Sequence, residues 1–292
     1  MEMLETLELA GIGLAVMGLL LCGGVWIALA LGATGYAVMT IYGGLPTGIN
    51  LATSQWSALN SWTLAALPMF VWMGEILFRT RLSQQLFSGL SPWVRRIPGR
   101  LLHVNVLACG IFGAVSGSSA ATCATVSKIA IPELQRRGYD LDQTIGSLAT
   151  AGTLGILIPP SIIMVVYAVA AEVSIIHVFL AGFLPGFLVM ALFSLYIIVW
   201  AVLNPARQPP QEPSTSWREK MQSLRDLGPV TILTIGVIAA MMTGYATATE
   251  AAAVGVLGSL MVAAWDGDLT WQTFSESLAG ATRLSCMIMF IL

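Results

Sequence analysis

The chain has 292 residues, of which 57% are hydrophobic and 10% charged, and its mean hydropathy is +0.82. Soluble domains carry about 25% charged residues, so this composition excludes an ordinary water-soluble fold and predicts a protein that lies in lipid. The net charge of −2 is too small to indicate nucleic-acid binding. The four cysteines lie in apolar stretches without paired spacing, which indicates small buried side chains rather than disulfides or metal ligands.

The first apolar run, at 9–31, is long enough to cross a bilayer. No basic segment precedes it and no clear cleavage site follows, so we expect a retained first helix rather than a secretory signal. Residues 34–59 are too polar and broken for a span and predict at most a short interfacial helix. Further runs of spanning length lie at 60–78, 143–170, 178–203 and 229–264.

Basic residues predict which side of the membrane each loop faces. Arginines and a lysine gather in three places, which are residues 79–100, the pair Arg136 and Arg137, and the polar linker 204–228. The loops 171–177 and 265–270 contain acidic residues and no Lys or Arg. We therefore expect the three basic segments to be cytoplasmic and the two acidic loops to be external.

An interrupted apolar run at 101–131 has basic residues at both of its ends, so it must enter the membrane and return to the same side. Its middle reads "GAVSGSSAATCATVSK" at 113–128, with Gly117 between Ser116 and Ser118. This pattern predicts a re-entrant helical hairpin whose tip must avoid lipid. The alternative is that the small residues serve close helix packing and that the hydroxyls bond back to their own helix.

A second irregular stretch, "GTLGILIPPS" at 152–161, lies inside the predicted span 143–170. Two consecutive prolines remove two amide donors and disfavour helix in the residues before them. The helix should break near mid-membrane and leave free carbonyls before Pro159. A tolerated proline kink is the alternative, but two breaks in adjacent segments are typical of the sites of secondary transporters.

Together, "FGAVSGSSAATCATVSKIAIPELQRRGYD" and "ATAGTLGILIPPSIIMVVYAV" closely resemble the large membrane subunit of TRAP transporters, the DctM family. The stretches "LPMFVWMGEILFRT" at 67–80 and "TGYATATEAAAVGVLGSL" at 243–260 extend the resemblance over essentially the whole chain. One departure is Ala248, where many relatives have proline.

The resemblance implies an all-α integral membrane protein, an elevator-type transporter of two inverted repeats, each with a re-entrant hairpin and a broken helix. It implies scaffold helices at 1–94, the first transport hairpin and broken helix at 95–170, a connecting helix and cytoplasmic linker at 171–228, and the start of a second repeat at 229–292. The chain stops inside an apolar segment, so we expect the second repeat to be incomplete and the chain to be truncated.

Sodium is the coupling ion that the resemblance implies, bound between the hairpin tip and the helix break. Neutral hydroxyls and carbonyls suit such a hard cation and are less costly to bury than carboxylates. The predicted ion ligands come from the tip and from the start of the break: Ser116, Gly117, Ser118, Gly152, Thr153 and Gly155. Two predicted substrate-binding residues, Ser119 and Ser161, lie at half-helix N-termini. The others are Thr122, a weaker candidate whose hydroxyl could bond back to its own helix, and Glu250, an acid that looks buried.

Several polar residues have two interpretations. Glu250 could serve substrate binding or accept hydrogen bonds from neighbouring amides. Lys128 fits a side chain snorkelling toward the cytoplasm, with substrate contact as the alternative. Pro68 and Glu75 indicate scaffold packing, and His103 and His177 lie near segment ends.

The function that the resemblance implies is sodium-coupled uptake of small organic acids, C4-dicarboxylates among them, across the bacterial inner membrane by a multi-pass, non-enzymatic protein. The implied partners are a small membrane subunit (Q), a periplasmic substrate-binding protein (P), the lipid bilayer and the organic anion, but no nucleic acid. The alternatives are an ion or solute channel, a purely structural membrane subunit and, with Ser116 as nucleophile, an intramembrane serine protease. No arginine lies clearly in a membrane core, so hydroxyls, amides and helix termini are expected to meet the anion.

Overall fold

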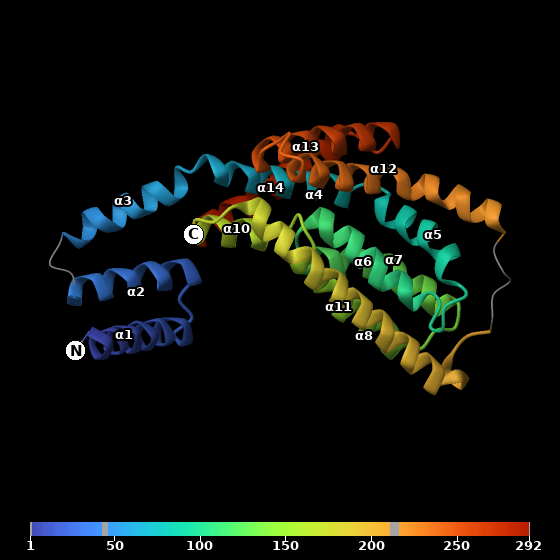
Figure 1. Ribbon diagram of the computed structural model, residues 1–292, viewed down its shortest axis with the longest axis horizontal. Coiled ribbons are helices and arrows are strands. Elements are labelled where there is room, and N and C mark those ends of the chain that lie inside the picture. The colour runs from blue at the N-terminus through green and yellow to red at the C-terminus, as the bar shows by residue number, and fades with distance from the viewer. Residues whose placement is uncertain (1, 43–45, 211–215, 292) are drawn as a thin grey trace. The chain divides into compact units, whose positions relative to one another are not determined.

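A computed structural model describes residues 2–42, 46–210 and 216–291 of the chain (Figure 1). Within these ranges the chain forms helices joined by turns, and no strand. It divides into two compact units, one made of Met1–Ser61 with Arg283–Leu292 and the other of Trp62–Thr282. The predicted all-α architecture is therefore confirmed.

The first unit begins with a helical pair rather than the single helix expected at 9–31. Helix α1 (Glu2–Cys22) ends at two consecutive glycines, and α2 (Ile27–Tyr42) packs back against it. Gly24 has φ of 77°, a conformation that glycine adopts without a side-chain penalty, so the glycine pair turns the chain. Helix α3 (Thr47–Leu59) is the short helix expected within 34–59.

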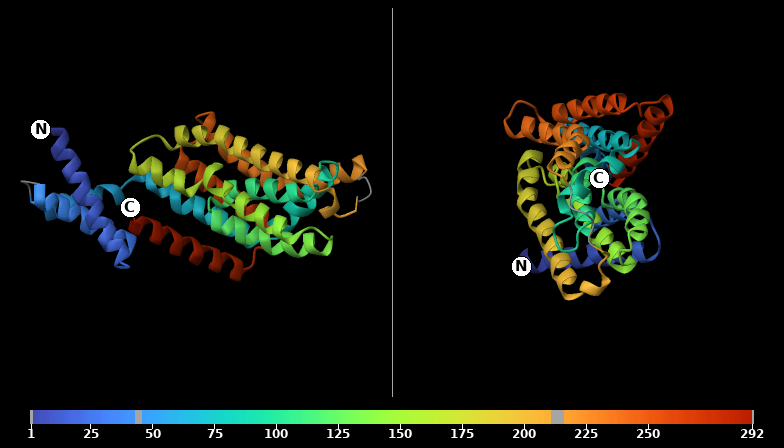
Figure 2. Two further views of the ribbon diagram at one scale, coloured as in Figure 1. Left: turned by 90° about the horizontal axis from the view of Figure 1, so that it is seen from below. Right: turned by 90° about the vertical axis from the view of Figure 1, so that its right-hand side faces the viewer.

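The second unit holds most of the chain. Its helices, in chain order, are η1 (Trp62–Ala65), α4 (Ala66–Phe78), α5 (Leu82–Val94), α6 (Leu102–Ser116), α7 (Ser119–Arg136), α8 (Leu141–Gly152), α9 (Leu154–Leu157), α10 (Ile162–Ala170), α11 (Ile175–Leu203), η2 (Pro205–Arg207), α12 (Trp217–Met242) and α13 (Ala248–Trp265). Helix α14 (Trp271–Ile291) begins in this unit. Helices α6 to α9 pack against one another, and α11 lies along them (Figures 1 and 2).

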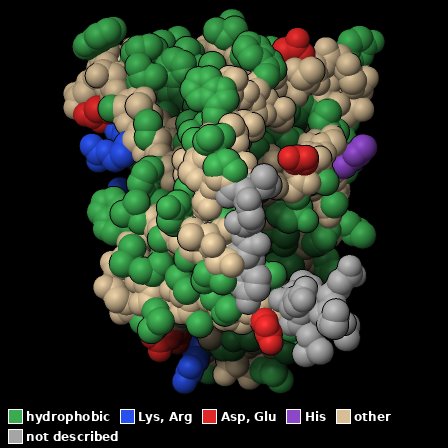
Figure 3. All heavy atoms as spheres, turned by 90° about the vertical axis from the view of Figure 1, so that its left-hand side faces the viewer, with side chains coloured by type: hydrophobic (Ala, Val, Ile, Leu, Met, Phe, Trp, Pro, Cys, Tyr) green, Lys and Arg blue, Asp and Glu red, His purple; other side chains and the backbone are tan. Residues whose placement is uncertain are grey.

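Three described segments are long and apolar enough to cross a membrane, namely Leu141–Ala170, Ile175–Leu203 and Ala248–Trp265, or up to five if each of two bent helix pairs is one span. The protein buries 56% of the apolar window in the first but only 17% in the second, so α11 exposes its side chains as a lipid-facing helix does. The surface shown in Figure 3 is accordingly rich in hydrophobic side chains and poor in charged ones. These properties are those of a multi-pass membrane protein.

The apolar run predicted at 229–264 is not one continuous helix. It divides at a turn between α12 and α13, where Gly244 has φ of 76° and Thr247 caps the new helix. Helix α13 packs against α12 and runs back along it (Figure 1). The chain therefore reverses once more than the hydropathy of the run suggests.

This extra reversal corrects the predicted placement of the acidic loop 265–270. Arg81 lies beside Asp268, with 3.3 Å between Nε and Oδ1, and the Arg81 backbone N–H donates to Asp268 Oδ2 at 2.8 Å. Gln85 Nε2 also donates to Asp266 Oδ2, at 3.1 Å. The acidic loop therefore lies beside the start of the basic segment 79–100, which contradicts the expectation that the loop and this part of the segment lie on opposite sides of the membrane.

Single cysteines test this arrangement in a cysteine-free background. Ile97→Cys, Leu269→Cys and Val173→Cys replace side chains of similar exposure, at 38%, 39% and 46%. Positions 97 and 269 should both resist an impermeant thiol reagent applied outside, while position 173, beyond the span Leu141–Ala170, should react. Labelling of 269 from outside without labelling of 97 would show that the acidic loop is external after all.

Candidate functional site

The hairpin predicted from 101–131 is present. Helix α6 ends at Ser116, and Gly117 turns the chain in the left-handed conformation with φ of 60° and donates its N–H to Gly113 O at 2.8 Å. Ser118 then caps α7, its Oγ accepting from Ala121 N at 3.4 Å. Helices α6 and α7 pack against each other, so the tip lies at Gly117 as predicted.

Hydroxyl groups form a closed cluster just inside the tip. Thr122 Oγ1 donates to Ser118 O at 2.7 Å, and Ser116 Oγ lies 2.7 Å from Thr122 Oγ1. Since the Thr122 proton is used on Ser118 O, Ser116 is the donor of the second bond. Both side chains are buried, with Thr122 fully so. Thr122 thus makes the back-bond that was expected as the alternative to substrate contact.

The helix break predicted at 152–161 is also present. Helix α8 ends at Gly152, the short α9 follows, and the backbone is extended at Ile158 before two prolines. Helix α10 restarts with Ser161 as its N-cap residue. Ser161 is 1% exposed and its Oγ has no hydrogen-bond partner. A polar atom buried without a partner is costly in a structural site and is the kind of atom that a bound ligand would satisfy.

The hairpin tip and the helix break lie directly against each other because glycines face glycines there. A Cβ placed on Gly113 would be 2.7 Å from Gly155 Cα, and one on Gly117 would be 2.8 Å from Ile162 N. A Cβ placed on Gly155 would be 2.9 Å from Thr122 Oγ1 and 3.1 Å from Ser118 O. The predicted residues Ser116, Gly117, Ser118, Thr122 and Gly155 are therefore brought together, with Ser161 at the restart of α10 next to Ile162.

Three other predicted ligands lie at the margin of this cluster. Gly152 packs against Cys123, one turn farther along α7 from the tip. Thr153 is exposed, its Oγ1 donates to Thr150 O at 2.6 Å, and its carbonyl accepts from Ile156 N at 3.1 Å. Ser119 is half-buried at the first position of α7. Neither Gly152 nor the Thr153 side chain joins the hydroxyl cluster.

Glu250 differs from its predicted burial. It is exposed at the start of α13, where its Oε2 accepts from the Thr247 backbone N–H and from Thr247 Oγ1, both at 2.8 Å. Its own N–H donates to Thr247 Oγ1 at 3.3 Å, which completes a capping box. The alternative role, that of an acceptor for neighbouring amides, is the one observed.

Glu250 variants separate the capping role from a substrate role. Glu250→Ala should lower the free energy of unfolding by about 1 kcal/mol, because the first turn of α13 loses its cap acceptor. Glu219→Ala is the matched control, because Glu219 Oε2 accepts from Ser216 N at 3.1 Å at the start of α12. We expect Glu250→Ala and Glu219→Ala to lose equal amounts of unfolding free energy in titrations, and Glu250→Gln to transport as the unchanged protein does. Loss of transport by Glu250→Gln at normal stability would instead show that the acid serves the substrate.

Two residues of this region were not singled out from the sequence. Gly74 of α4 lies under the tip, where a Cβ would be 3.0 Å from Ser116 Cα. Asn105 is fully buried in α6 and donates from Nδ2 to Ser147 Oγ of α8 at 2.9 Å, while its Oδ1 has no partner. The sequence feature that indicates Asn105 is a single amide side chain in an otherwise apolar run, where a polar group is costly to bury.

The arrangement does not suit peptide-bond hydrolysis by Ser116. Its hydroxyl bonds to Thr122, and the ring of His103 lies 13 residues earlier on the same helix with Nε2 2.8 Å from Pro98 O. At 1.5 Å per residue this places the imidazole roughly 20 Å from Ser116 along α6. Within the described residues, no group of three or more His, Cys, Asp or Glu could hold a metal ion. The oxygens at the tip are neutral hydroxyls and carbonyls.

Comparisons with known proteins assign the chain to a family. The family model "Tripartite ATP-independent periplasmic transporter, DctM component" matches residues 14–292. The C4-dicarboxylate TRAP transporter large permease protein DctM of Pseudomonas aeruginosa is 36% identical over 83% of this chain and 56% of its own length. The ectoine/5-hydroxyectoine permease protein UehC of Ruegeria pomeroyi is 32% identical over 87% of this chain and 59% of its own, and the 2,3-diketo-L-gulonate permease protein YiaN of Escherichia coli is 30% identical over 82% and 56%.

The chain spans somewhat more than half the length of these curated relatives. The family model, in contrast, covers nearly all of the chain, from residue 14 to residue 292. Its members are transporter permeases and not enzymes. The chain therefore belongs to the DctM family of TRAP transporter large permease subunits.

Proposed function

We propose that this chain takes part in the sodium-coupled uptake of small organic acids across the bacterial inner membrane. One observation carries the proposal, which is the contact between the hairpin tip of α6 and α7 and the helix break before α10. Broken helices that meet in this way form the ion and substrate sites of secondary transporters. The oxygens gathered there are neutral, which suits a monovalent cation and is less costly to bury than carboxylates.

Sodium is held in this proposal by Ser116, Ser118 and the backbone near Gly155, and the unpartnered Ser161 Oγ faces the ion or the substrate. Thr122 orients the cluster through its bonds to Ser116 and Ser118. The N-termini of α7 and α10 contribute positive dipole ends that favour an anionic group. Gly152 and Thr153 are peripheral positions of the same site, and Ser119 is a further hydroxyl at the α7 terminus.

The names of the relatives support the proposed substrate class. Their printed names concern C4-dicarboxylates, ectoine and 2,3-diketo-L-gulonate, which are small solutes carrying a carboxylate. A periplasmic binding protein that delivers such a solute, and a small membrane subunit that braces the scaffold, complete the proposed tripartite system. In an elevator mechanism, the hairpin and broken helix move together, and α12 to α14 begin an inverted second repeat.

Reconstitution with the small subunit and the binding protein tests the proposal. Uptake of the carboxylate should saturate, require the binding protein and require an inward sodium gradient. Each charge that crosses 100 mV supplies about 2.3 kcal/mol, which corresponds to a concentration ratio of about 50. Equal uptake driven by potassium would contradict sodium coupling, and uptake that never saturates would indicate a channel.

A further inference from the structure

An open pocket lies away from the hairpin tip, in the second unit. It has a volume of about 270 Å³ and is lined by the α4–α5 junction at 78–84, by Thr125, Lys128 and Ile129 of α7, and by Asp268. None of the residues at the hairpin tip lines it. The pocket is therefore separate from the site described above.

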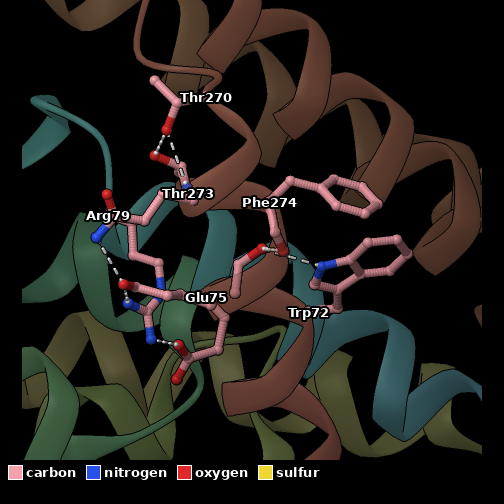
Figure 4. A network of polar contacts seen from close by, with 9 residues as sticks. Trp72, Glu75, Arg79, Thr270, Thr273 and Phe274 are labelled. Carbon is pink, nitrogen blue, oxygen red and sulfur yellow. Dashed lines mark hydrogen bonds and ion pairs between the residues drawn. The ribbon is translucent and has the colours of Figure 1, made fainter.

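Three cations and three acids lie at or beside this pocket. Arg79 is neutralised by two acids, its NH1 lying 2.6 Å from Glu276 Oε2 and its NH2 3.3 Å from Glu75 Oε2 (Figure 4). The Arg79–Glu276 pair ties the end of α4 to α14, together with the bond from Trp72 Nε1 to Ser277 Oγ at 3.3 Å. Glu75 pairs with Arg79 within its own segment, and its role in scaffold packing stays a prediction.

Arg81 is in turn neutralised by Asp268 at 3.3 Å. Lys128 is exposed, and its Nζ lies 5.9 Å from the centre of the Phe78 ring. Among the described residues, no acidic group lies within ion-pair distance of Lys128. Lys128 is therefore the cation at this pocket that has no ion-pair partner among the described residues.

A buried hydroxyl without a partner lies in the same wall. Thr125 is 7% exposed, and its Oγ1 has no hydrogen-bond partner. Thr125 and Lys128 are three residues apart on α7, so their side chains share one face of the helix. Snorkelling explains an unpaired Lys128 but not an unsatisfied Thr125 hydroxyl beside it.

We propose that this pocket binds one oxyanion group, a carboxylate or phosphate, through Lys128 Nζ and the Thr125 hydroxyl. Both side chains donate hydrogen bonds, and a negatively charged oxygen accepts from both. The group could come from a soluble organic or inorganic anion or from the headgroup of an anionic phospholipid, because basic pockets between membrane helices hold such headgroups. The proposal does not depend on sodium coupling, and binding is measured without sodium.

The two lysines of this chain, Lys128 and Lys220, make a direct measurement possible. Lys220 is a matched control, because its Nζ also lies over an aromatic ring, 5.6 Å from the centre of Trp93, but outside the pocket. Reductive methylation with ¹³C-formaldehyde keeps the charge and labels both lysine amines in the full chain in nanodiscs. Lys128→Arg and Lys220→Arg assign the two signals.

Succinate and inorganic phosphate are the soluble probes, titrated against potassium chloride at constant ionic strength. The Lys128 signal should shift to saturation with a probe while the Lys220 signal stays constant. Thr125→Val should raise the half-saturating concentration about tenfold, the typical effect of one hydrogen bond to a charged group, and Thr125→Ser should restore it. Thr125→Val should fold normally, because the hydroxyl that it removes has no internal partner.

Lipid composition identifies the source of the anion. In phosphatidylglycerol nanodiscs, a Lys128 signal already shifted without probe would identify a lipid headgroup, whereas equal signals in phosphatidylcholine and phosphatidylglycerol would identify a soluble anion. Parallel shifts of both lysine signals with the probes would overturn the proposal. An unchanged midpoint in Thr125→Val would overturn it as well.

Discussion

Gly117→Ala is expected to destabilise the protein by roughly 2–5 kcal/mol, the largest effect of any single methyl group at the hairpin tip. Two costs add at this position. A left-handed backbone costs an alanine about 1–2 kcal/mol, and Gly117 has φ of 60°. The new Cβ would also lie 2.8 Å from Ile162 N and 2.9 Å from Ile162 Cγ1, which forces the tip away from the helix break.

Gly138→Ala separates these two costs. Gly138 also has a left-handed backbone, with φ of 79°, but a Cβ added there would have nothing within 4 Å. It should therefore lose only the backbone cost, and the difference between the two variants in unfolding titrations measures how tightly the tip meets the break. Equal losses would show that the tip and the break are not in contact.

Gly113→Ala should be destabilising by about 1–3 kcal/mol although alanine is the better helix former. Its Cβ would lie 2.7 Å from Gly155 Cα and 2.9 Å from Gly155 N, and backbone atoms cannot move aside as a flexible side chain does. Helices α6 and α9 would have to separate. Sodium-dependent uptake should fall with the stability, because the same contact holds the tip residues against the break.

The control for Gly113→Ala is Gly146→Ala, which is expected to change the stability in the opposite direction. Gly146 lies inside α8, and a Cβ added there would have nothing within 4 Å, so Gly146→Ala gains helix propensity without a clash. It should be neutral or stabilising by up to about 1 kcal/mol. If Gly113→Ala also stabilises the protein, the close approach of α6 and α9 is wrong.

Local chemistry made the hairpin tip and the helix break predictable. A glycine between serines in an apolar run, and two prolines in the next run, each break a helix whatever surrounds them. Flanking arginines then required both ends of the hairpin to lie on one side. The structure agrees, because Leu101 N donates to Tyr139 Oη at 3.2 Å and Arg100 NH1 donates to Pro209 O at 2.6 Å, which joins the basic segments.

Features set by tertiary packing were not predictable in the same way. Hydropathy alone cannot show that the run 229–264 folds back at Gly244, because both halves are equally apolar. The positive-inside rule placed the acidic loop 265–270 outside because the loop has no Lys or Arg. The rule could not show that Asp268 of this loop pairs with Arg81. Burial of Glu250 was expected because its neighbours are alanines, whereas the capping box holds it at an exposed helix start.

Sodium binding at the hairpin tip is the central claim, and a stability titration tests it most directly. Sodium should raise the unfolding midpoint of the full chain to saturation when it replaces potassium at constant ionic strength. Ser116→Ala should raise the half-saturating sodium concentration about tenfold. Thr150→Val should leave it unchanged, because that exposed hydroxyl bonds Gly146 O in its own helix at 2.8 Å. Equal stabilisation by sodium and potassium, or equal behaviour of the two variants, would contradict the account.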